Sequence, residues 1–452
     1  MASAAEQMAA NLSWSALGKA TDLRHRIFFT IGLLIVYRIG TYIPVPGIDG
    51  TALREFMESL STGIGGMLNM FTGGAISRMG IFALGIMPYI SASIIVQLLA
   101  AMVPSLEQLK KEGEQGRKKL NQYTRYGTVA LAVFQAWGIA VSLESGGLAH
   151  DPGMFFRVAC VITLVGGTMF LMWLGEQITA RGIGNGVSLI IFVGIVAEIP
   201  AALAQFFSQG RSGALSPPVI IGVIVMVVVV IGFVVFMERA LRKITIQYPR
   251  RQQGMKIYEG GSSHLPIKVN PANVIPAIFA SSLLLLPVTV STFSGQQTGP
   301  IMSTLLAYFG PGQPLYLLFF TVMIVFFTYF YTHNVSFKTD DVADNLKNQN
   351  GFVPGIRPGK KTAEYLEYVV NRILVLGSAY LAAVCLLPEF LRNQFAIPFY
   401  FGGTSVLIVV SVTMDTINQV QSHLLAHQYE GLIERSQLRG RKRSGSRRPT
   451  RR

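Results

Sequence analysis

The stretch GIFALGIMPYISASIIVQLL, residues Gly80–Leu99, is long and apolar enough to cross a lipid bilayer, which takes about 20 residues. Pro88 lies in the middle of the stretch, and small residues such as Gly85 and Ser91 interrupt its large apolar side chains. The segment just before it, Thr62–Ser77, is rich in glycine and too short to span. A half-length segment beside a broken span is typical of membrane segments that line a cavity rather than face lipid. We expect the rest of the chain to be arranged around this pair.

The composition is that of an integral membrane protein. Of the 452 residues, 51% are hydrophobic and 13% are charged, whereas soluble domains carry about 25% charged residues. Between Lys268 and Lys338 the sequence contains no Asp, Glu, Lys or Arg. Cys160 and Cys385 both fall within apolar runs, so we expect buried thiols and no disulfide framework.

Hydropathy predicts ten membrane spans, all of them helical. Their approximate bounds are Ile27–Ile43, Ile81–Val103, Tyr126–Leu143, Phe155–Leu174, Val187–Phe206, Val219–Met237, Val274–Phe293, Tyr316–Tyr331, Val369–Leu387 and Phe399–Met414. The N-terminal segment Met1–Ala20 is polar and lacks the apolar core of a signal peptide, so we expect the first span to be retained.

Basic residues predict the orientation of these spans. Lys and Arg gather before the first span, in the second, sixth and eighth loops, and in the C-terminal tail. The alternate loops Gly146–Gly153 and Ser294–Pro314 contain neither residue. Positively charged loops stay inside, so the even-numbered loops and both termini are expected in the cytoplasm.

Ten spans divide into two sets of five, and a repeated odd-numbered unit must be inverted the second time. The predicted fold is therefore an all-α membrane protein in two pseudo-symmetric inverted halves, spans 1–5 and 6–10, with the functional site near their interface. The predicted parts are a cytoplasmic segment at 1–26, an N-terminal half at 27–210, a C-terminal half at 211–428, and a basic tail at 429–452. A basic, low-complexity tail is expected to be disordered.

The cytoplasmic loops 239–270 and 338–361 are long and basic. Positive-inside topology accounts for part of this charge, but it needs only a few residues near the span ends. Their length favours the docking of a cytoplasmic partner, either a ribosome with its RNA phosphates or an acidic protein surface.

Motifs for catalysis, nucleotide binding or metal binding are incomplete. The run PGIRPGKKT, Pro354–Thr362, has proline where a phosphate-binding loop needs glycine, and RGIGNG, Arg181–Gly186, shares only its glycine content with a dinucleotide-binding loop. His423 and His427 are four residues apart but lack the glutamate of the zinc-protease motif. We therefore expect no enzymatic activity, cofactor or metal.

Two other classes of membrane protein remain as alternatives. A secondary transporter needs an ion or substrate site within the membrane, but Arg38 and Glu198 lie near the ends of their spans and can reach the interface. An intramembrane protease needs a Ser/His pair, and His333 lies only at the cytoplasmic end of its span. The uncharged midplane favours a passive path.

Several motifs of the sequence resemble those of the SecY family, the channel subunits of the bacterial protein-export translocon. They are Gly80–Leu99, WLGEQITARGIGNGVSLII at Trp173–Ile191, VYRIGTYIPVPGID at Val36–Asp49, HLPIKVNPANVIPAIFASS at His264–Ser282, GFVPGIRPGKKT at Gly351–Thr362 and FGGTSVLIVVSVTMDT at Phe401–Thr416. The resemblance implies ten helices around a central hourglass pore. It also implies a protein-conducting channel of the bacterial inner membrane that translocates unfolded secretory polypeptides and releases transmembrane segments sideways into lipid.

The resemblance further implies an apolar constriction at the waist of this channel, here called the pore ring. Its members would be Ile86, Ile90, Val187, Ile191, Ile278 and Ile408. A narrow apolar constriction resists wetting and so holds back ions, while it offers a passing polypeptide no hydrogen bonds to stick to. A plug within Thr62–Ser77 would close the pore from outside. Its residues would be Gly65, Met67, Met70 and Phe71.

The lateral gate implied by the resemblance lies between spans two and three on one side and spans seven and eight on the other. We call this boundary the seam, and its polar residues would be Ser91, Gln135 and Ser282. Docking of the ATPase SecA or of the ribosome, which would supply the energy, is implied for Arg239, Arg242, Arg250, Arg251 and Arg357. The other implied partners are SecE and SecG as membrane subunits, signal sequences, membrane lipids, SecDF and YidC.

Overall fold

The computed structural model describes most of the chain. The described residues are 21–50, 52–53, 69, 72–213, 216–249, 251–253, 256–258, 261–293, 313–395 and 403–444. The expected plug residues Gly65, Met67, Met70 and Phe71, and the expected docking residue Arg250, lie outside these ranges.

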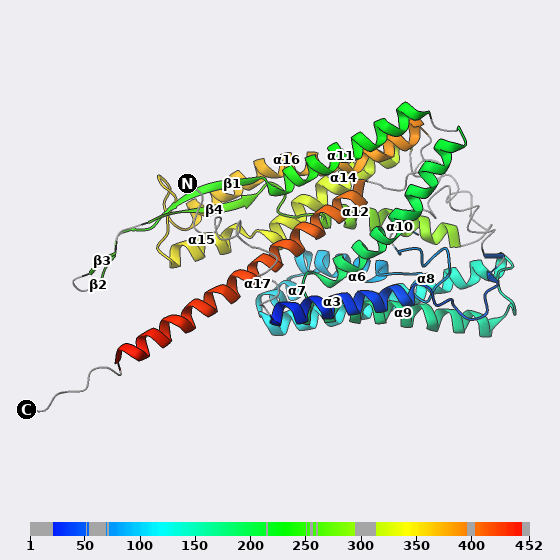
Figure 1. Cartoon of the computed structure of the whole chain (residues 1–452), viewed down its shortest axis with the longest axis horizontal. Coiled ribbons are helices and arrows are strands. Elements are labelled where there is room, and N and C mark those ends of the chain that lie inside the picture. The colour runs from blue at the N-terminus through cyan, green and yellow to red at the C-terminus, as the bar shows by residue number, and fades with distance from the viewer. Residues whose placement is uncertain are drawn as a thin grey trace, which may run out of the picture. The chain divides into compact units, whose positions relative to one another are not determined.

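Each of the ten predicted spans overlaps one helix (Figure 1). These helices are α3 (Thr21–Gly40), α6 (Met87–Met102), α8 (Glu114–Ser145), α9 (Met154–Arg181), α10 (Gly186–Arg211), α11 (Pro217–Arg239), α12 (Ile275–Phe293), α14 (Pro314–Tyr331), α16 (Lys360–Phe395) and α17 (Gly403–Ser444). Within the described ranges, six helices are long and apolar enough to cross a membrane, and the bent pair of α6 and α7 (Pro104–Lys111) makes a seventh if it is counted as one span. The fold is that of a multi-pass, mostly helical membrane protein.

The second span begins later than the hydropathy indicates. The prediction placed its start at Ile81 and Pro88 in its middle, but α6 starts at Met87 and has Pro88 in its first turn. Proline is tolerated there because the first N–H groups of a helix have no partner within the helix. Residues 72–86 form turns, and Gly85 has a φ of +57° that favours glycine. The chain therefore enters α6 from a tight turn and not from a longer helix.

The loop that follows α11 contains short strands, which the sequence analysis did not predict. There β1 (Leu241–Gln247) pairs antiparallel with β4 (Ser262–Lys268), and β2 (Arg251–Gln253) pairs with β3 (Lys256–Tyr258) further out (Figure 1). We call residues 241–268 the cytoplasmic arm. Ile244 and Ile246 are buried and their neighbours are exposed, which is the period-two pattern of a strand with one covered face.

The tail also differs from the expectation of disorder. The helix α17 continues to Ser444, so residues 429–444 are helical, and 445–452 lie outside the described part of the chain. The stretch after Met414 is rich in Gln, Glu, Leu and Arg, which are good helix formers, and has no proline before Pro449.

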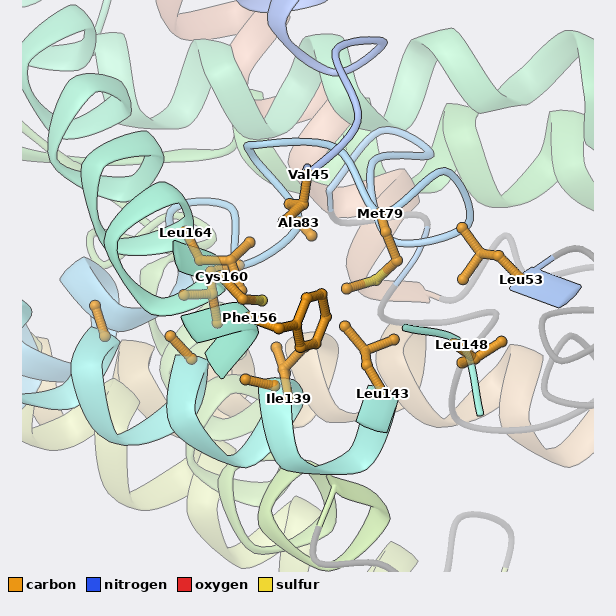
Figure 2. Packing of buried hydrophobic residues seen from close by; sticks show 14 residues of the cluster. Val45, Leu53, Met79, Ala83, Ile139, Leu143, Leu148, Phe156, Cys160 and Leu164 are labelled. Atoms are coloured by element: carbon orange, nitrogen blue, oxygen red, sulfur yellow. The ribbon is translucent and has the colours of Figure 1, made fainter. Parts of the chain in front are cut away.

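The described contacts group the chain into two compact units. Unit 1 holds residues 1–39, 172–190 and 412–452, and unit 2 holds residues 40–171 and 191–411. A core of unit 2 lies where α8 and α9 meet the turns at 45–53 and 79–84 (Figure 2). The ring of Phe156 lies among Ile139, Leu143 and Met79 there, and all four side chains are at most 5% exposed. This packing holds the turn that leads into α6.

Candidate functional site

Five members of the expected pore ring belong to unit 2, and all five are buried. Ile408 is 0% exposed, and the most exposed of them, Ile278, reaches 7%. None of the five therefore faces outward from the unit, although unit 2 carries many exposed large apolar side chains on its spans. Ile86 precedes α6 and its backbone oxygen accepts a hydrogen bond from Ile90 N at 3.1 Å, so these two residues are one helical turn apart.

The turn before α6 is held by close backbone packing. A side chain at Gly80 would come within 2.7 Å of Thr41 O, and one at Gly85 within 3.1 Å of the Thr72 methyl group. Asn69 fixes the preceding turn, because its side-chain oxygen accepts from Ser77 N and its backbone oxygen accepts from Gly74 N, both at 2.9 Å. The glycines of the motif thus allow the chain to approach Thr41 and Thr72 closely.

A charged group in this region was missed by the sequence analysis. The Arg78 guanidinium lies over the Tyr42 ring, 4.2 Å from its centroid, and its Nη1 atom is buried without a hydrogen-bond partner. The carboxylate of Glu198 lies against Gly74, as the Arg78 guanidinium does. The sequence signal for this group was the position of Arg78 directly after the glycine-rich segment Thr62–Ser77.

The two sides of the seam touch in unit 2. The helix α12 packs on both α6 and α8, and Ser282 Oγ lies 3.9 Å from Met87 Sδ. All three expected polar residues are buried, with Ser91 at 5%, Gln135 at 9% and Ser282 at 3% exposure. On the side of the seam formed by spans seven and eight, α12 is joined to α14 by Phe279, whose ring makes edge-to-face contacts with Phe327 and Tyr331. The seam is therefore closed along these helices.

The remaining ring candidate, Val187, lies in unit 1 and is half-buried in the first turn of α10. The loop before it donates hydrogen bonds to side chains of three helices, and we call these contacts the loop clamp. Ile183 N donates to Thr30 Oγ1 of α3 at 3.1 Å, Gly184 N to Gln419 Oε1 of α17 at 2.7 Å, and Gly186 N to Thr179 Oγ1 of α9 at 2.9 Å.

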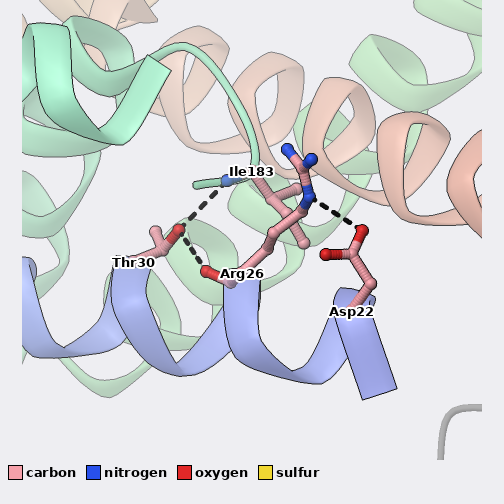
Figure 3. Close-up of polar contacts among 4 residues, drawn as sticks. All are labelled: Asp22, Arg26, Thr30 and Ile183. Atoms are coloured by element: carbon pink, nitrogen blue, oxygen red, sulfur yellow. Dashed lines mark hydrogen bonds and ion pairs between the residues drawn. The ribbon is translucent and has the colours of Figure 1, made fainter. Parts of the chain in front are cut away.

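The loop clamp explains the glycines of the RGIGNG motif. Gly184 has a φ of +88°, and a side chain there would come within 2.8 Å of Leu189. Thr30 serves two partners, since it also donates to Arg26 O at 2.9 Å, and Arg26 pairs with Asp22 at 3.2 Å (Figure 3). The loop is thus a packed joint that positions the start of α10.

The expected docking residues lie on two loops that the structure joins. Arg239 and Arg242 at the root of the cytoplasmic arm are exposed, and so is Arg357.

Gln247 of β1 exchanges two backbone hydrogen bonds with Phe352, at 2.9 and 3.0 Å. Beneath this bridge, Ile244 and Ile267 of the arm share an apolar cluster with Val353 and with Leu366 of α16. The two loops thus form one basic surface. The backbone of Arg251 lies in β2, paired with Tyr258.

Comparison with known proteins identifies the family. The SecY family model matches residues 80–417. The chain is 52% identical over 431 residues to the protein translocase subunit SecY of Escherichia coli K12, with 94% of this chain and 97% of the relative covered. It is also 52% identical over 430 residues to the SecY subunit of Pseudomonas aeruginosa, with 95% and 97% covered.

Solved structures share the fold at lower identity. The first is described as the structure of a protein conducting channel, with a TM-score of 0.65, 19% identity, and 88% of this chain and 92% of that chain covered. The second is Sec61 in the canine ribosome-channel complex from the endoplasmic reticulum, with a TM-score of 0.61, 18% identity, and coverage of 88% and 92%. On the strength of the matched family model and of relatives that align over nearly the whole sequence, the chain belongs to the SecY family.

Proposed function

We propose that this chain is the channel subunit of a protein translocase of the bacterial inner membrane, with both termini in the cytoplasm. Unfolded secretory polypeptides would pass through the pore ring, and transmembrane segments would leave sideways through the seam. The bilayer interior offers no hydrogen-bond partners to an unfolded backbone, so a path through protein is required. The curated relatives carry the translocase name, which supports the same role here.

The observation that carries this proposal is the closed but lightly bonded seam. Its sides meet through α12 on α6 and α8, with weak polar contacts such as that of Ser282 with Met87. Interhelical polar contacts in membranes contribute about 1–2 kcal/mol or less. An apolar signal helix can displace contacts of that size, while the buried isoleucines of the pore ring keep the idle path dry.

The energy for transport would come from a partner, and the channel itself would catalyse no reaction. The basic surface formed by the cytoplasmic arm and the loop at Arg357 suits SecA or the ribosome, and the canine Sec61 relative was solved with a ribosome. SecE and SecG would complete the membrane part of the complex.

The proposal is tested by cross-linking during export. Cysteines replace Ser91 or Ser282 in the seam, and a matched control replaces Ser208, an exposed residue near the end of α10. The complex is reconstituted with SecE, SecG and SecA, and a secretory protein with a cysteine in its signal sequence is arrested in transit. Adducts at the two seam positions and none at Ser208 are expected. Efficient export without seam adducts for several secretory proteins would contradict the exit route.

A further inference from the structure

A lysine joins the two sides of the seam at the ends of their helices. Lys110 Nζ donates a hydrogen bond to the backbone oxygen of Asn334 at 2.8 Å. Lys110 belongs to α7, which follows α6 after a bend of 104° and packs on both α6 and α8. Asn334 belongs to η1 (Thr332–Ser336), a π-helical turn that continues α14. The bond therefore ties the side made by α6 and α8 to the side made by α14.

The geometry at the end of α14 explains why a lysine binds there. The last carbonyl groups of a helix have no partner within the helix, and a basic side chain pairs with them and with the negative end of the helix dipole. Two carbonyls of the preceding turn are already capped locally, since Asn334 Nδ2 donates to Phe330 O and His333 Nδ1 lies beside Tyr329 O, each at 3.0 Å. The oxygen of Asn334 is capped from across the seam instead.

Neighbouring charges weaken this contact. Burial and the nearby charge of Lys338 lower the pKa of Lys110 below its ordinary value, and Glu107 offsets part of the change. Lys338 is exposed at the start of α15 (Thr339–Asn348), directly after η1. The ammonium group is therefore attracted by the Asn334 carbonyl and by Glu107, and it is repelled by Lys338 and Arg117, which makes the bond easier to break.

The turn that accepts this bond is also tied to the root of the cytoplasmic arm. Ser336 Oγ donates to Pro271 O at 2.7 Å, and Pro271 lies between the end of β4 and the start of α12. One short turn thus contacts both the arm root and Lys110, and a displacement of the arm root would act on it directly.

We propose that Lys110 is a positioning residue that holds the cytoplasmic end of the seam closed until its two sides are parted. The inference rests on the proposed function of the seam as an exit, and it adds a latch to that exit. When the bond to Asn334 breaks, α7 and η1 can separate, and α6 can move away from α12 and α14.

The test measures the separation of α6 and α14 directly. Spin labels are attached to cysteines at Leu99 of α6 and Phe326 of α14, which are 43% and 51% exposed, while native Cys160 and Cys385 are buried. Lys110→Met removes the donor and Lys110→Arg keeps it. Lys118→Met makes the same charge change at an exposed position of α8. Pulsed electron-spin resonance in nanodiscs gives the distance distribution of each variant.

Lys110→Met is expected to raise the population with the longer distance about tenfold, the effect of losing one hydrogen bond to a charged donor. Export of a protein with a weakened signal sequence should rise by about the same factor, since parting the seam costs less. Lys110→Arg and Lys118→Met should resemble the parent. Lys338→Gln should act in the opposite direction, because it removes the repulsion, and it remains informative if Lys110→Met does not fold.

The possible outcomes test the latch and the proposed exit route separately. Equal distance distributions for Lys110→Met and Lys118→Met would overturn the latch whatever the export assay shows. A Lys338→Gln distribution shifted toward longer distances would overturn it as well. A longer distance in Lys110→Met with unchanged export would support the latch and count against the seam as the exit route.

Discussion

Isoleucine suits the pore ring at the level of single residues. Its side chain is branched at Cβ, which restricts χ1 and keeps its shape fixed until it is pushed. Ile86, Ile90, Ile278 and Ile408 are buried at 7% exposure or less and offer no hydrogen-bonding group. In the proposed pore ring, these properties would exclude water without binding a passing polypeptide.

Polar substitution of the ring should make the idle channel conduct ions. Replacing Ile86, Ile90, Ile278 and Ile408 together by serine lets water enter the constriction, so resting conductance in planar bilayers should rise at least several-fold. Replacement of the same four residues by leucine keeps the apolar character and serves as the control. Conductance that stays at the parental level in the serine variant, with export intact, would rule out the ring as the ion barrier.

A second residue prediction concerns the cytoplasmic surface. Arg357 is exposed and its backbone oxygen accepts from Thr362 Oγ1 at 2.9 Å, so the loop keeps its shape when the side chain changes. Arg357→Glu should impair SecA-driven export at least tenfold, while insertion of the channel into the membrane stays normal. Lys347→Glu, an equal charge change on exposed α15, is the control. Wild-type export kinetics for Arg357→Glu would refute the docking role.

The sequence predicted whether a single side chain is buried or exposed where its apolar or charged character alone decides this. Burial of the ring isoleucines and exposure of Arg357 follow from apolar and charged character. The role of Pro88 did not follow, because the same residue either breaks a helix or starts one, and only the turn before it decides. Lys110 was counted as topology charge, since its carbonyl partner lies 224 residues away in the chain.

At the scale of elements, the loop clamp is the most constrained feature of unit 1. Five N–H groups of the loop and the first turn of α10 donate to side-chain oxygens, three of them to other helices and two to Asn185 Oδ1. These hydrogen bonds matter because a buried N–H group that loses its acceptor lowers the stability of the fold by about 1–3 kcal/mol.

Thr30→Val should therefore lower the thermal stability of the protein. Thr30 is 8% exposed, and valine has its shape but cannot accept from Ile183 N, so the melting temperature in detergent should fall by a few degrees. Thr30→Ser keeps the hydroxyl and should stay close to the parent. Identical melting curves for the valine and serine variants would show that the hydroxyl contributes nothing to the clamp.

Elements defined by long apolar runs were predictable, and the cytoplasmic arm was not. Each of the ten predicted spans overlaps a helix. The strands of the arm are short and basic, and among their described side chains only Ile244, Ile246 and Ile267 are buried. This is too little to outweigh the interpretation of the loop as topology charge. The second partner of β1 is Phe352, in a different loop, which no local pattern indicates.

At the scale of the whole molecule, the expected inverted halves stay a prediction. The units formed by the described contacts divide the chain differently, since unit 1 combines residues of α3, α9, α10 and α17. Sequence motifs gave the family because long patterns such as that at Gly80–Leu99 are specific. They could not give the grouping of helices, which depends on contacts between segments far apart in the chain.

The central claim is that a secretory polypeptide passes through the pore ring, and photo-cross-linking from the ring tests it most directly. A photoreactive amino acid replaces Ile278 or Ile408 in the ring, and Ile162 or Ile224, which are 67% and 46% exposed, in control variants. A secretory protein is then arrested midway in a reconstituted complex driven by SecA. The account predicts adducts from both ring positions and none from the controls. Adducts of equal yield at all four positions, or none at the ring during efficient export, would contradict it.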